Sequence, residues 1–170
     1  MNKALFLDRD GILNKVVMRN GQVGSPRSVS EFEIIIEAKD LVNRSKAREY
    51  LVLVVTNQPD VGRGVMNFAE VEAMHRILRG TFSIDDITVC TTGDDSDFRR
   101  KPNPGMILEL AERFKVDLTN SFLLGDNQKD IAAGKTAGVK TILLKKPYNK
   151  DIQGIADYDC STYAEVMNVL

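Results

Sequence analysis

Tryptophan is absent from the chain, histidine occurs once and cysteine occurs twice. A single histidine, His75, cannot form a histidine pair around a metal ion, and we expect it to be a surface or partly packed residue. Cys90 and Cys160 lie far apart and neither belongs to a CxxC pair, which favours reduced thiols that are packed or bystander residues rather than reactive ones. These scarcities argue against a disulfide framework and against a histidine-based metal site.

Long apolar runs and a dominant charge sign are also missing. The N-terminus reaches Asp8 after four apolar residues, too few for a signal-peptide core, and no window approaches the ~18 apolar residues of a transmembrane helix. The 23 basic and 24 acidic residues give a net charge of −1, so no global field attracts nucleic acid or an anionic membrane. We expect a cytoplasmic protein that binds a small molecule, with no nucleic-acid or membrane partner.

The pattern of apolar residues predicts an α/β fold. The 170 residues are 43% hydrophobic, enough for a proper core, and their number favours one domain over residues 1–170. Apolar runs without polar alternation are typical of a parallel sheet covered on both faces. The predicted strands are Ala4–Leu7, Leu51–Val55, Ile87–Cys90, Ser121–Leu124 and Val139–Leu144.

Helix-like segments lie between these strands. One covers Phe68–Leu78, with Asn67 as its N-cap and Glu70 placed as in a capping box. Another begins at Asn103-Pro104, with a cap followed by proline at the first helical position. Weaker helices are predicted near residues 37–49, 129–136 and 162–169. The interval from Gly11 to Ile36 is long for a connection, and we expect a short hairpin or flap over the site there.

Polar residues follow three of the predicted strands directly. Asp8 and Asp10 come after the first, Thr56-Asn57-Gln58 after the second, and Asp126 with nearby Asp130 after the fourth. In an open α/β sheet the ligand crevice lies beyond the carboxyl ends of the strands. The three groups are therefore expected to converge on one site.

Each residue type at this edge suits phosphate chemistry. Asp8 and Asp126 supply the carboxylates that Mg²⁺ prefers beside substrate phosphate oxygens. Thr56 and Asn57 offer donors for phosphate oxygens without adding charge. Lys101 brings a positive charge that offsets the phosphate and a nucleophilic carboxylate. The combination indicates phosphoryl transfer.

These residues also have plainer alternative roles. Asp8 and Asp10 would then form a strand-end turn, and Thr56-Asn57 a loop cap. Asp126 would cap the following helix, and Asp130 would pair with a helix dipole or a neighbouring lysine, so contact of Asp130 with a metal is left open. The basic side chains would be solvated charges: Arg63, Arg100 and Lys101.

The chain carries four ordered motifs: Asp8-Arg9-Asp10-Gly11, Val55-Thr56-Asn57-Gln58, Arg100-Lys101-Pro102 and Gly125-Asp126-Asn127-Gln128-Lys129-Asp130. With these motifs the chain resembles the haloacid dehalogenase (HAD) superfamily over about residues 4–146. Within that superfamily it is similar to the histidinol-phosphate and D-glycero-D-manno-heptose 1,7-bisphosphate phosphatases. The resemblance implies a Rossmann-like parallel sheet of strand order 5-4-1-2-3, and the short intervals between motifs leave no room for a large cap domain.

The resemblance also implies roles for individual residues. Asp8 matches the nucleophile that forms an aspartyl-phosphate, and Asp10 the general acid and base, whose backbone carbonyl also binds the metal. Asp126 matches the last ligand of Mg²⁺, alongside Asp8 and Asp10. The phosphate- and substrate-binding positions fall on Thr56, Asn57, Arg100 and Lys101.

One loop departs from the pattern of this branch. Its members usually carry a zinc loop, Cys-x-His followed by Cys-x-Cys, before the Arg-Lys-Pro motif. Here only Cys90 remains, with Thr92, Asp97 and Arg99 at the other three positions. One thiolate and a cation cannot build a tetrahedral site, so we expect no structural zinc and a loop closed by hydrogen bonds of its own aspartates.

The sequence thus predicts a Mg²⁺-dependent phosphatase that acts through an aspartyl-phosphate on a small metabolite, foremost D-glycero-D-manno-heptose 1,7-bisphosphate. Histidinol phosphate is the near alternative. A nucleic-acid 3′-phosphatase shares the motifs, but a duplex-binding surface needs excess positive charge that the net charge of −1 does not provide. A catalytically inactive binding module is the third class. We expect a monomer or weak homodimer.

Overall fold

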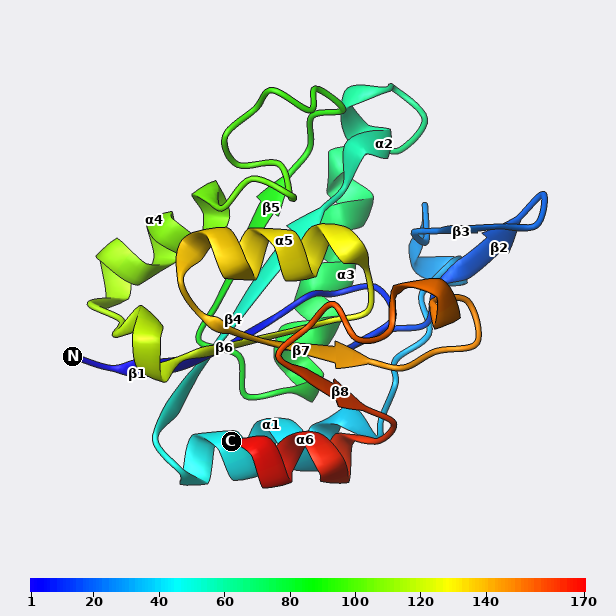
Figure 1. Cartoon of the computed structure of the whole chain (residues 1–170). Coiled ribbons are helices and arrows are strands. Elements are labelled where there is room, and N and C mark those ends of the chain that lie inside the picture. Colours follow the sequence, from blue (N-terminus) through cyan, green and yellow to red (C-terminus); the bar gives the residue numbers. More distant parts are fainter.

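The computed structural model describes residues 1–170 and contains a six-stranded, wholly parallel sheet of order β5-β4-β1-β6-β7-β8 (Figure 1). In order along the chain, the first five strands of this sheet are numbered 1 to 5 as β1, β4, β5, β6 and β7, so the predicted order 5-4-1-2-3 is confirmed. An unpredicted strand, β8, extends the sheet beyond β7. The strands are β1 Lys3–Leu7, β4 Tyr50–Asn57, β5 Asp86–Cys90, β6 Phe122–Gly125, β7 Lys140–Leu144 and β8 Tyr158–Cys160.

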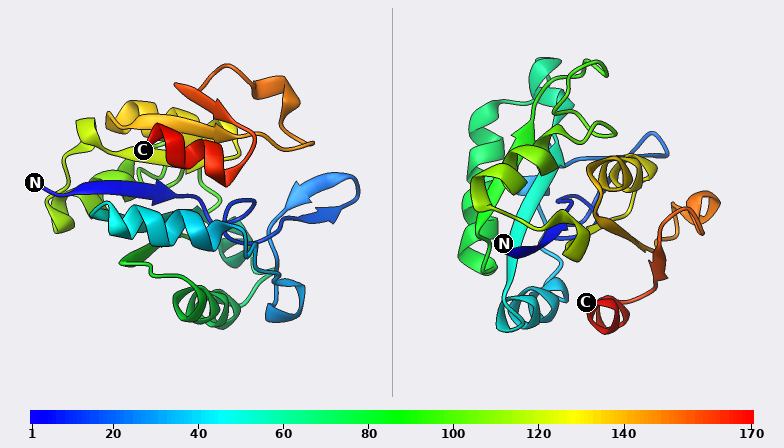
Figure 2. Two further views of the ribbon diagram at one scale, coloured as in Figure 1. Left: turned by 90° about the horizontal axis from the view of Figure 1, so that it is seen from below. Right: turned by 60° about the vertical axis from the view of Figure 1, so that its left-hand side comes forward.

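Helices cover both faces of the sheet, as the apolar strands predict. In β1, Leu5 and Leu7 pack with one core cluster, while Ala4 and Phe6 pack with the other. The first face is covered by α1 (Ala38–Ala47), α6 (Tyr163–Val169) and the end of α3 (Phe68–Thr81). The second is covered by α4 (Gly105–Phe114) and α5 (Gln128–Ala137), which lie on the opposite side of the sheet from α1 and α6 (Figures 1 and 2).

Two predicted helix starts differ from the structure. Asn67 caps α3 by accepting from the Ala69 amide, but Glu70 does not close a capping box, because its carboxylate accepts from the amide of Val29. Helix α4 begins at Gly105 without a side-chain cap, because Asn103 donates to the carbonyls of Asp95 and Asp97 instead. Both side chains bind neighbouring loops, which local sequence patterns do not encode.

A short hairpin stands beyond the end of β1. It consists of β2 (Val17–Arg19) and β3 (Gln22–Gly24) and projects from the body of the molecule (Figures 1 and 2), which confirms the predicted flap. The segment after it is held to the α2 region by an ion pair between Arg27 and Asp60 at 2.7 Å. The helix α2 (Pro59–Gly62) was not predicted, nor were the 3₁₀ turns Val29–Glu31, Leu118–Asn120 and Lys150–Ile152.

None of the helices combines the length and the apolar character that crossing a bilayer requires.

Candidate active site

The pairing of β1 with β6 brings the first and fourth motifs together. Leu7 is in register with Leu124, and the amide of Asp8 donates to the carbonyl of Leu124 at 3.0 Å. Gly11 makes the approach close, because a Cβ on it would lie 1.9 Å from Oδ2 of Asp126 and its φ of +83° favours glycine. The two carboxylates predicted to converge are therefore neighbours across the end of the sheet.

Lys101 joins the third motif to this cluster. Its Nζ donates to Oδ1 of Asp8 at 2.7 Å, to Oδ1 of Asp130 at 2.6 Å and to the carbonyl of Val55 at 2.9 Å. Burial by itself lowers the pKa of Lys101, but the carboxylates of Asp130 and Asp8 raise it above its ordinary value. Asp130 is thus part of the site rather than an exposed partner of a surface lysine, although it also closes the capping box of α5 by accepting from the Asn127 amide.

The charges of this cluster do not balance. Asp8, Asp126 and Asp130 each offer an oxygen, and these three atoms all lie within 4.8 Å of one another. Against them stands the single ammonium of Lys101, so three negative charges and one positive leave a formal charge of −2. Burial and the neighbouring carboxylate of Asp130 raise the pKa of Asp126 to about 7 and that of Asp8 well above its ordinary value. An all-oxygen donor set with two uncompensated charges fits a hard divalent cation.

The carboxylate of Asp10 has a different environment. Its Oδ1 accepts from Nε of Arg9 at 3.0 Å and from Asn14 at 2.8 Å, and its Oδ2 accepts from Ser25 at 2.6 Å and from Gln58 at 2.9 Å. Burial raises the pKa of Asp10, but the Arg9 guanidinium and the hydrogen bonds of these donors hold it below its ordinary value. Asp10 is therefore ionised and fixed in orientation.

Arg9 itself is fully buried, next to the ring of Phe32 and close to the only histidine. Burial and then the charge of Arg9 lower the pKa of His75 to about 4, so this histidine is neutral. His75 is half-buried, in agreement with the predicted partly packed residue.

The two residues of the second motif that are predicted to bind phosphate, Thr56 and Asn57, differ in how far the protein already uses their hydrogen-bonding groups. Thr56 is buried, and its hydroxyl oxygen accepts from Gln58 at 2.9 Å, which leaves its proton available. Both ends of the Asn57 amide contact the backbone of Lys101, with the nitrogen donating to the carbonyl at 2.9 Å and the oxygen accepting from the amide at 3.1 Å. Asn57 thus holds the strand end of β4 against the third motif, and phosphate binding by its side chain stays a prediction.

Three functional candidates were missed by the sequence analysis. The Tyr148 hydroxyl donates to Oδ2 of Asp126, and Asn149 donates to the Asp126 carbonyl at 2.8 Å. Ser25 brings the hairpin segment to Asp10. Tyr148 and Asn149 follow β7, so the strand-end rule applied to the other strands would have found them, whereas no sequence pattern indicates Ser25.

A cleft of about 630 Å³ is lined by the residues of this cluster and its supports: Asp8, Asp10, Ser25, Lys101, Asp126, Asp130, Tyr148 and Asn149. Five basic side chains stand around its walls, and only two further carboxylates accompany them. The basic residues are Arg19, Arg27, Arg63, Arg100 and Lys129, and the acidic ones are Asp60 and Asp151. The walls therefore carry five positive charges against two negative ones, while Glu31 and Asp95, which do not line the cleft, pair with Arg19 and Arg100.

The altered loop after β5 closes on its own aspartates, as predicted. Asp94 accepts from the amide and hydroxyl of Ser96, and Asp97 accepts from the amide of Arg99 at 2.7 Å. The Arg99 side chain pairs with Glu109 of α4 at 3.1 Å. The donors at the four zinc-loop positions are one thiol, one hydroxyl, one carboxylate and a guanidinium, a set that does not suit tetrahedral zinc.

Comparison with known proteins agrees with this architecture. Residues 98–152 match the HAD-hydrolase-like family model. A D-glycero-alpha-D-manno-heptose-1,7-bisphosphate 7-phosphatase of Burkholderia mallei is 37% identical over 156 residues, covering 84% of this chain and 79% of the relative. The chain belongs to the HAD-like phosphatases. A D-glycero-beta-D-manno-heptose-1,7-bisphosphate 7-phosphatase of Helicobacter pylori is 30% identical and covers 99% of this chain and 98% of its own.

Solved structures of HAD phosphatases show the same fold. A D,D-heptose 1,7-bisphosphate phosphatase from B. bronchiseptica, in complex with magnesium and phosphate, superimposes with a TM-score of 0.83 at 28% identity, over 98% of this chain and 97% of that one. The corresponding Burkholderia thailandensis enzyme has a TM-score of 0.69 at 22% identity over 99% and 98% of the two chains, and at that identity it shows the fold alone. The family uses a divalent metal ion, which agrees with the charge of the aspartate cluster.

Proposed function

We propose that this HAD phosphatase hydrolyses a sugar bisphosphate, D-glycero-D-manno-heptose 1,7-bisphosphate, through an aspartyl-phosphate on Asp8. The observation that supports this chemistry is the hydrogen bonding of the two oxygens of the Asp8 carboxylate. Its Oδ1 is bound to Lys101, whereas no protein group donates to its Oδ2. One oxygen is thus held in place while the other is free to attack phosphorus.

Lys101 and the aspartates prepare this attack. The ammonium offsets the negative charge of Asp8 and of the incoming phosphate, which otherwise repel each other. The hydroxyl proton of Thr56 supports a phosphate oxygen from the neighbouring strand end. Arg100 contacts the part of the substrate that extends up the cleft wall.

Asp10 is the general acid and base of the proposal. In the first step it protonates the leaving oxygen of the sugar, and in the second it takes a proton from the water that attacks the aspartyl-phosphate. Because its pKa is lowered, Asp10 is ionised and can accept the proton in the second step. For the first task it must gain a proton as the substrate dianion binds, because a nearby negative charge raises the pKa of a carboxyl group.

Asp8, Asp126 and the backbone carbonyl of Asp10 are the proposed ligands of Mg²⁺, and Asp130 contributes its charge to the same cluster. When bound, the ion neutralises the carboxylates and polarises the phosphate oxygens. Tyr148 and Asn149 hold Asp126 in position from the loop after β7.

The walls of the cleft support a substrate with a second anionic group. Five basic side chains against two carboxylates attract a bisphosphate and repel the cationic histidinol portion of histidinol phosphate. The 37% and 30% identical relatives named heptose-1,7-bisphosphate 7-phosphatases support the same choice, one for the alpha and one for the beta anomer. The single domain over residues 1–170, the monomer or weak homodimer and the cytoplasmic location stay predictions.

Phosphate release from a panel of substrates tests this proposal. We expect turnover of heptose 1,7-bisphosphate with Mg²⁺, at a kcat/KM about tenfold or more above that for histidinol phosphate, since one charged contact is worth about 1.4 kcal/mol or more. Chelation of divalent cations with EDTA is expected to abolish activity. A preference for histidinol phosphate would favour the alternative, and failure to hydrolyse any phosphomonoester would refute phosphatase activity.

Replacing Ser25 by alanine tests the positioning of Asp10 by the hairpin segment. The variant removes one of the four donors on the carboxylate, and we expect kcat to fall about tenfold with little change in KM, because general acid–base catalysis depends on orientation. Ser28→Ala is the matched control, since the Ser28 hydroxyl contacts only that of Ser30. Equal effects of the two substitutions on kcat would argue against the role of Ser25.

A further inference from the structure

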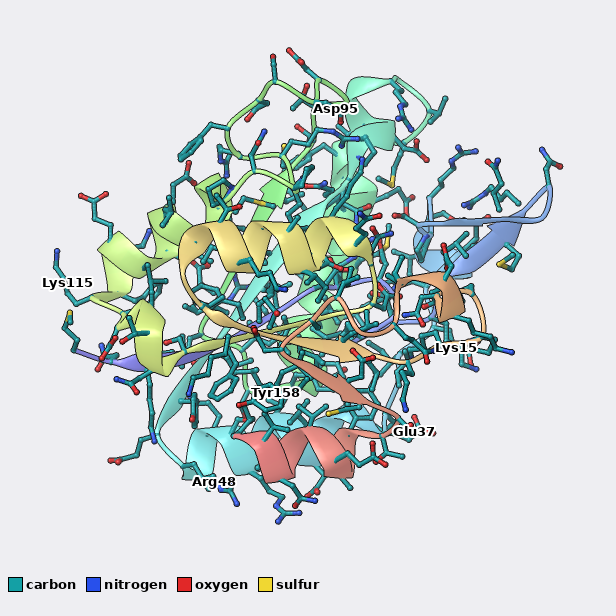
Figure 3. All side chains as sticks on the ribbon, viewed as in Figure 1. Lys15, Glu37, Arg48, Asp95, Lys115 and Tyr158 are labelled. Atoms are coloured by element: carbon teal, nitrogen blue, oxygen red, sulfur yellow. The ribbon has the colours of Figure 1, made fainter.

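Asp95 lies on the altered loop between β5 and α4, at the end of the molecule beside α2 (Figure 3). Its Oδ1 accepts from Nε of Arg100 at 2.8 Å and lies 3.9 Å from Nζ of Lys129. The hydrogen bond from Arg100, together with the charges of Lys129, Arg100 and Arg63, holds the pKa of Asp95 below its ordinary value. The exposed carboxylate of Asp95 thus lies between the side chains of Arg100 and Lys129.

The cations belong to the cleft, whereas Asp95 does not. Arg100, Lys129 and Arg63 line its wall, and Asp95 approaches them from outside. The Arg100 side chain is only 7% exposed and is held by the carbonyl of Thr92 at 3.1 Å, while the Asp95 side chain is 76% exposed. No protein group accepts from Nη2 of Arg100. The Arg100 guanidinium is therefore fixed in position and has an unused N–H donor, while the exposed Asp95 carboxylate can move away into water.

The Asp95 carboxylate is not needed to close its own loop. The loop is held by Asp94, by Asp97 and by Asn103, which donates to the backbone carbonyls of Asp95 and Asp97. The only hydrogen bond of the Asp95 carboxylate is the one with Arg100. Its displacement into water would leave the loop intact, and the cost of breaking this ion pair is small because the carboxylate is already mostly exposed to water.

We propose that Asp95 is a displaceable internal anion that holds the place of the substrate's second phosphate and sets the selectivity of the cleft for bisphosphates. A phosphate dianion offers three oxygens and a higher charge than a carboxylate, so it outcompetes Asp95 for Arg100 and Lys129. A hydroxyl or a neutral group at the same place does not displace Asp95. The inference rests on the proposed function and adds a specificity-determining residue to it.

Asp95→Asn tests the competition, because it keeps the shape and the hydrogen-bond acceptor while removing the charge. We expect the KM for heptose 1,7-bisphosphate to fall about two- to fivefold with unchanged kcat, in line with the strength of an exposed ion pair. The KM for heptose 7-phosphate, which lacks the second phosphate, is expected to change by less than a factor of about two. Asp95→Ser provides a second variant with the same loss of charge.

Asp94→Asn is the matched control. It removes the same charge from the adjacent residue and keeps the acceptor for Ser96, but its carboxylate does not contact Arg100 or Lys129. In an Arg100→Gln background, Asp95→Asn is expected to have a smaller effect on the ratio of the two KM values, because the cation that is hydrogen-bonded to Asp95 is gone and only Lys129, at 3.9 Å, remains.

The outcomes separate this inference from the function on which it rests. A fall in the bisphosphate KM relative to the 7-phosphate KM in Asp95→Asn, absent in Asp94→Asn, supports the inference. Turnover of both substrates with an unchanged ratio, or an equal shift of both KM values, overturns the inference alone. If the unmodified enzyme hydrolyses neither substrate, the proposed function fails and the inference fails with it.

Discussion

Replacing Asp8 by asparagine is expected to lower kcat by about 10⁴-fold or more, the size of effect seen when a covalent nucleophile is removed. An amide cannot form the acyl-phosphate that we propose for the free Oδ2 of Asp8. The measurement is phosphate release at saturating substrate, together with acid quenching of the enzyme mixed with ³²P-labelled substrate. Unmodified enzyme should retain label on the protein, and Asp8→Asn should not.

The control for this variant must separate chemistry from folding. Asp40→Asn makes the same substitution on the exposed surface of α1, where the carboxylate contacts only Arg44 of the next turn, and should leave kcat within about a factor of two. Label bound covalently to Asp8→Asn would show that another residue is the nucleophile and would refute the assigned role.

Replacing Asp126 by asparagine is expected to raise the free energy of unfolding of the metal-free protein at pH 8, by an amount on the order of a few kcal/mol. Burial and the repulsion of Asp130 raise the pKa of Asp126 to about 7, from an ordinary value of 3.8. Asparagine removes the charge and still accepts a hydrogen bond from Tyr148. A substitution in the active site would thus stabilise the fold, because the native cluster holds charges for function rather than for stability.

The pH dependence of this effect has a definite sign. Between about pH 4 and pH 7, Asp126 binds more protons in the native state than in the unfolded state. The protonated Asp126 therefore stabilises the fold fully below pH 4, and this stabilisation is lost as the pH rises through 7. The advantage of Asp126→Asn should therefore be large at pH 8 and vanish near pH 4. Urea unfolding at several pH values with EDTA present measures it.

Addition of Mg²⁺ should reverse the order of the two proteins. Binding to the native state stabilises the unmodified chain by mass action, whereas Asp126→Asn has lost a ligand and should gain little. Asp151→Asn, which removes an exposed charge from the same cleft, is the control and should keep both the pH profile and the Mg²⁺ response. A metal-free Asp126→Asn protein that is less stable than the unmodified chain at pH 8 would contradict the argument.

Where the sequence analysis was right, it relied on properties that are local and periodic. Continuous apolar runs predicted the five central strands, and the rule that ligands bind at their carboxyl ends placed Asp8, Thr56 and Asp126 at one edge. The four motifs supplied Lys101, whose position 93 residues from Asp8 no periodicity could have connected to it. These features depend on hydrogen-bonding geometry common to all parallel sheets.

The sequence analysis failed where a side chain forms its hydrogen bond with a residue far away in the chain instead of with its own helix. Glu70 bonds Val29 instead of its own helix, and Asn103 holds the loop at Asp95 instead of capping α4. Local patterns rank the nearest partners first, but a folded chain offers competing acceptors that only the packing of loops brings within reach.

The sequence by itself determined the fold class through strand burial, and the resemblance of its four ordered motifs supplied the strand order and the candidate reacting carboxylates, because burial pattern and motif order are written along the chain. Only the tertiary structure decided the protonation of these carboxylates and the hydrogen-bond and ion-pair partners that fix their orientation. It placed Asp130 on Lys101, Ser25 on Asp10 and Asp95 on the cations of the cleft wall. Such pairings depend on desolvation and on distances between loops, and these quantities exist only once the chain is folded.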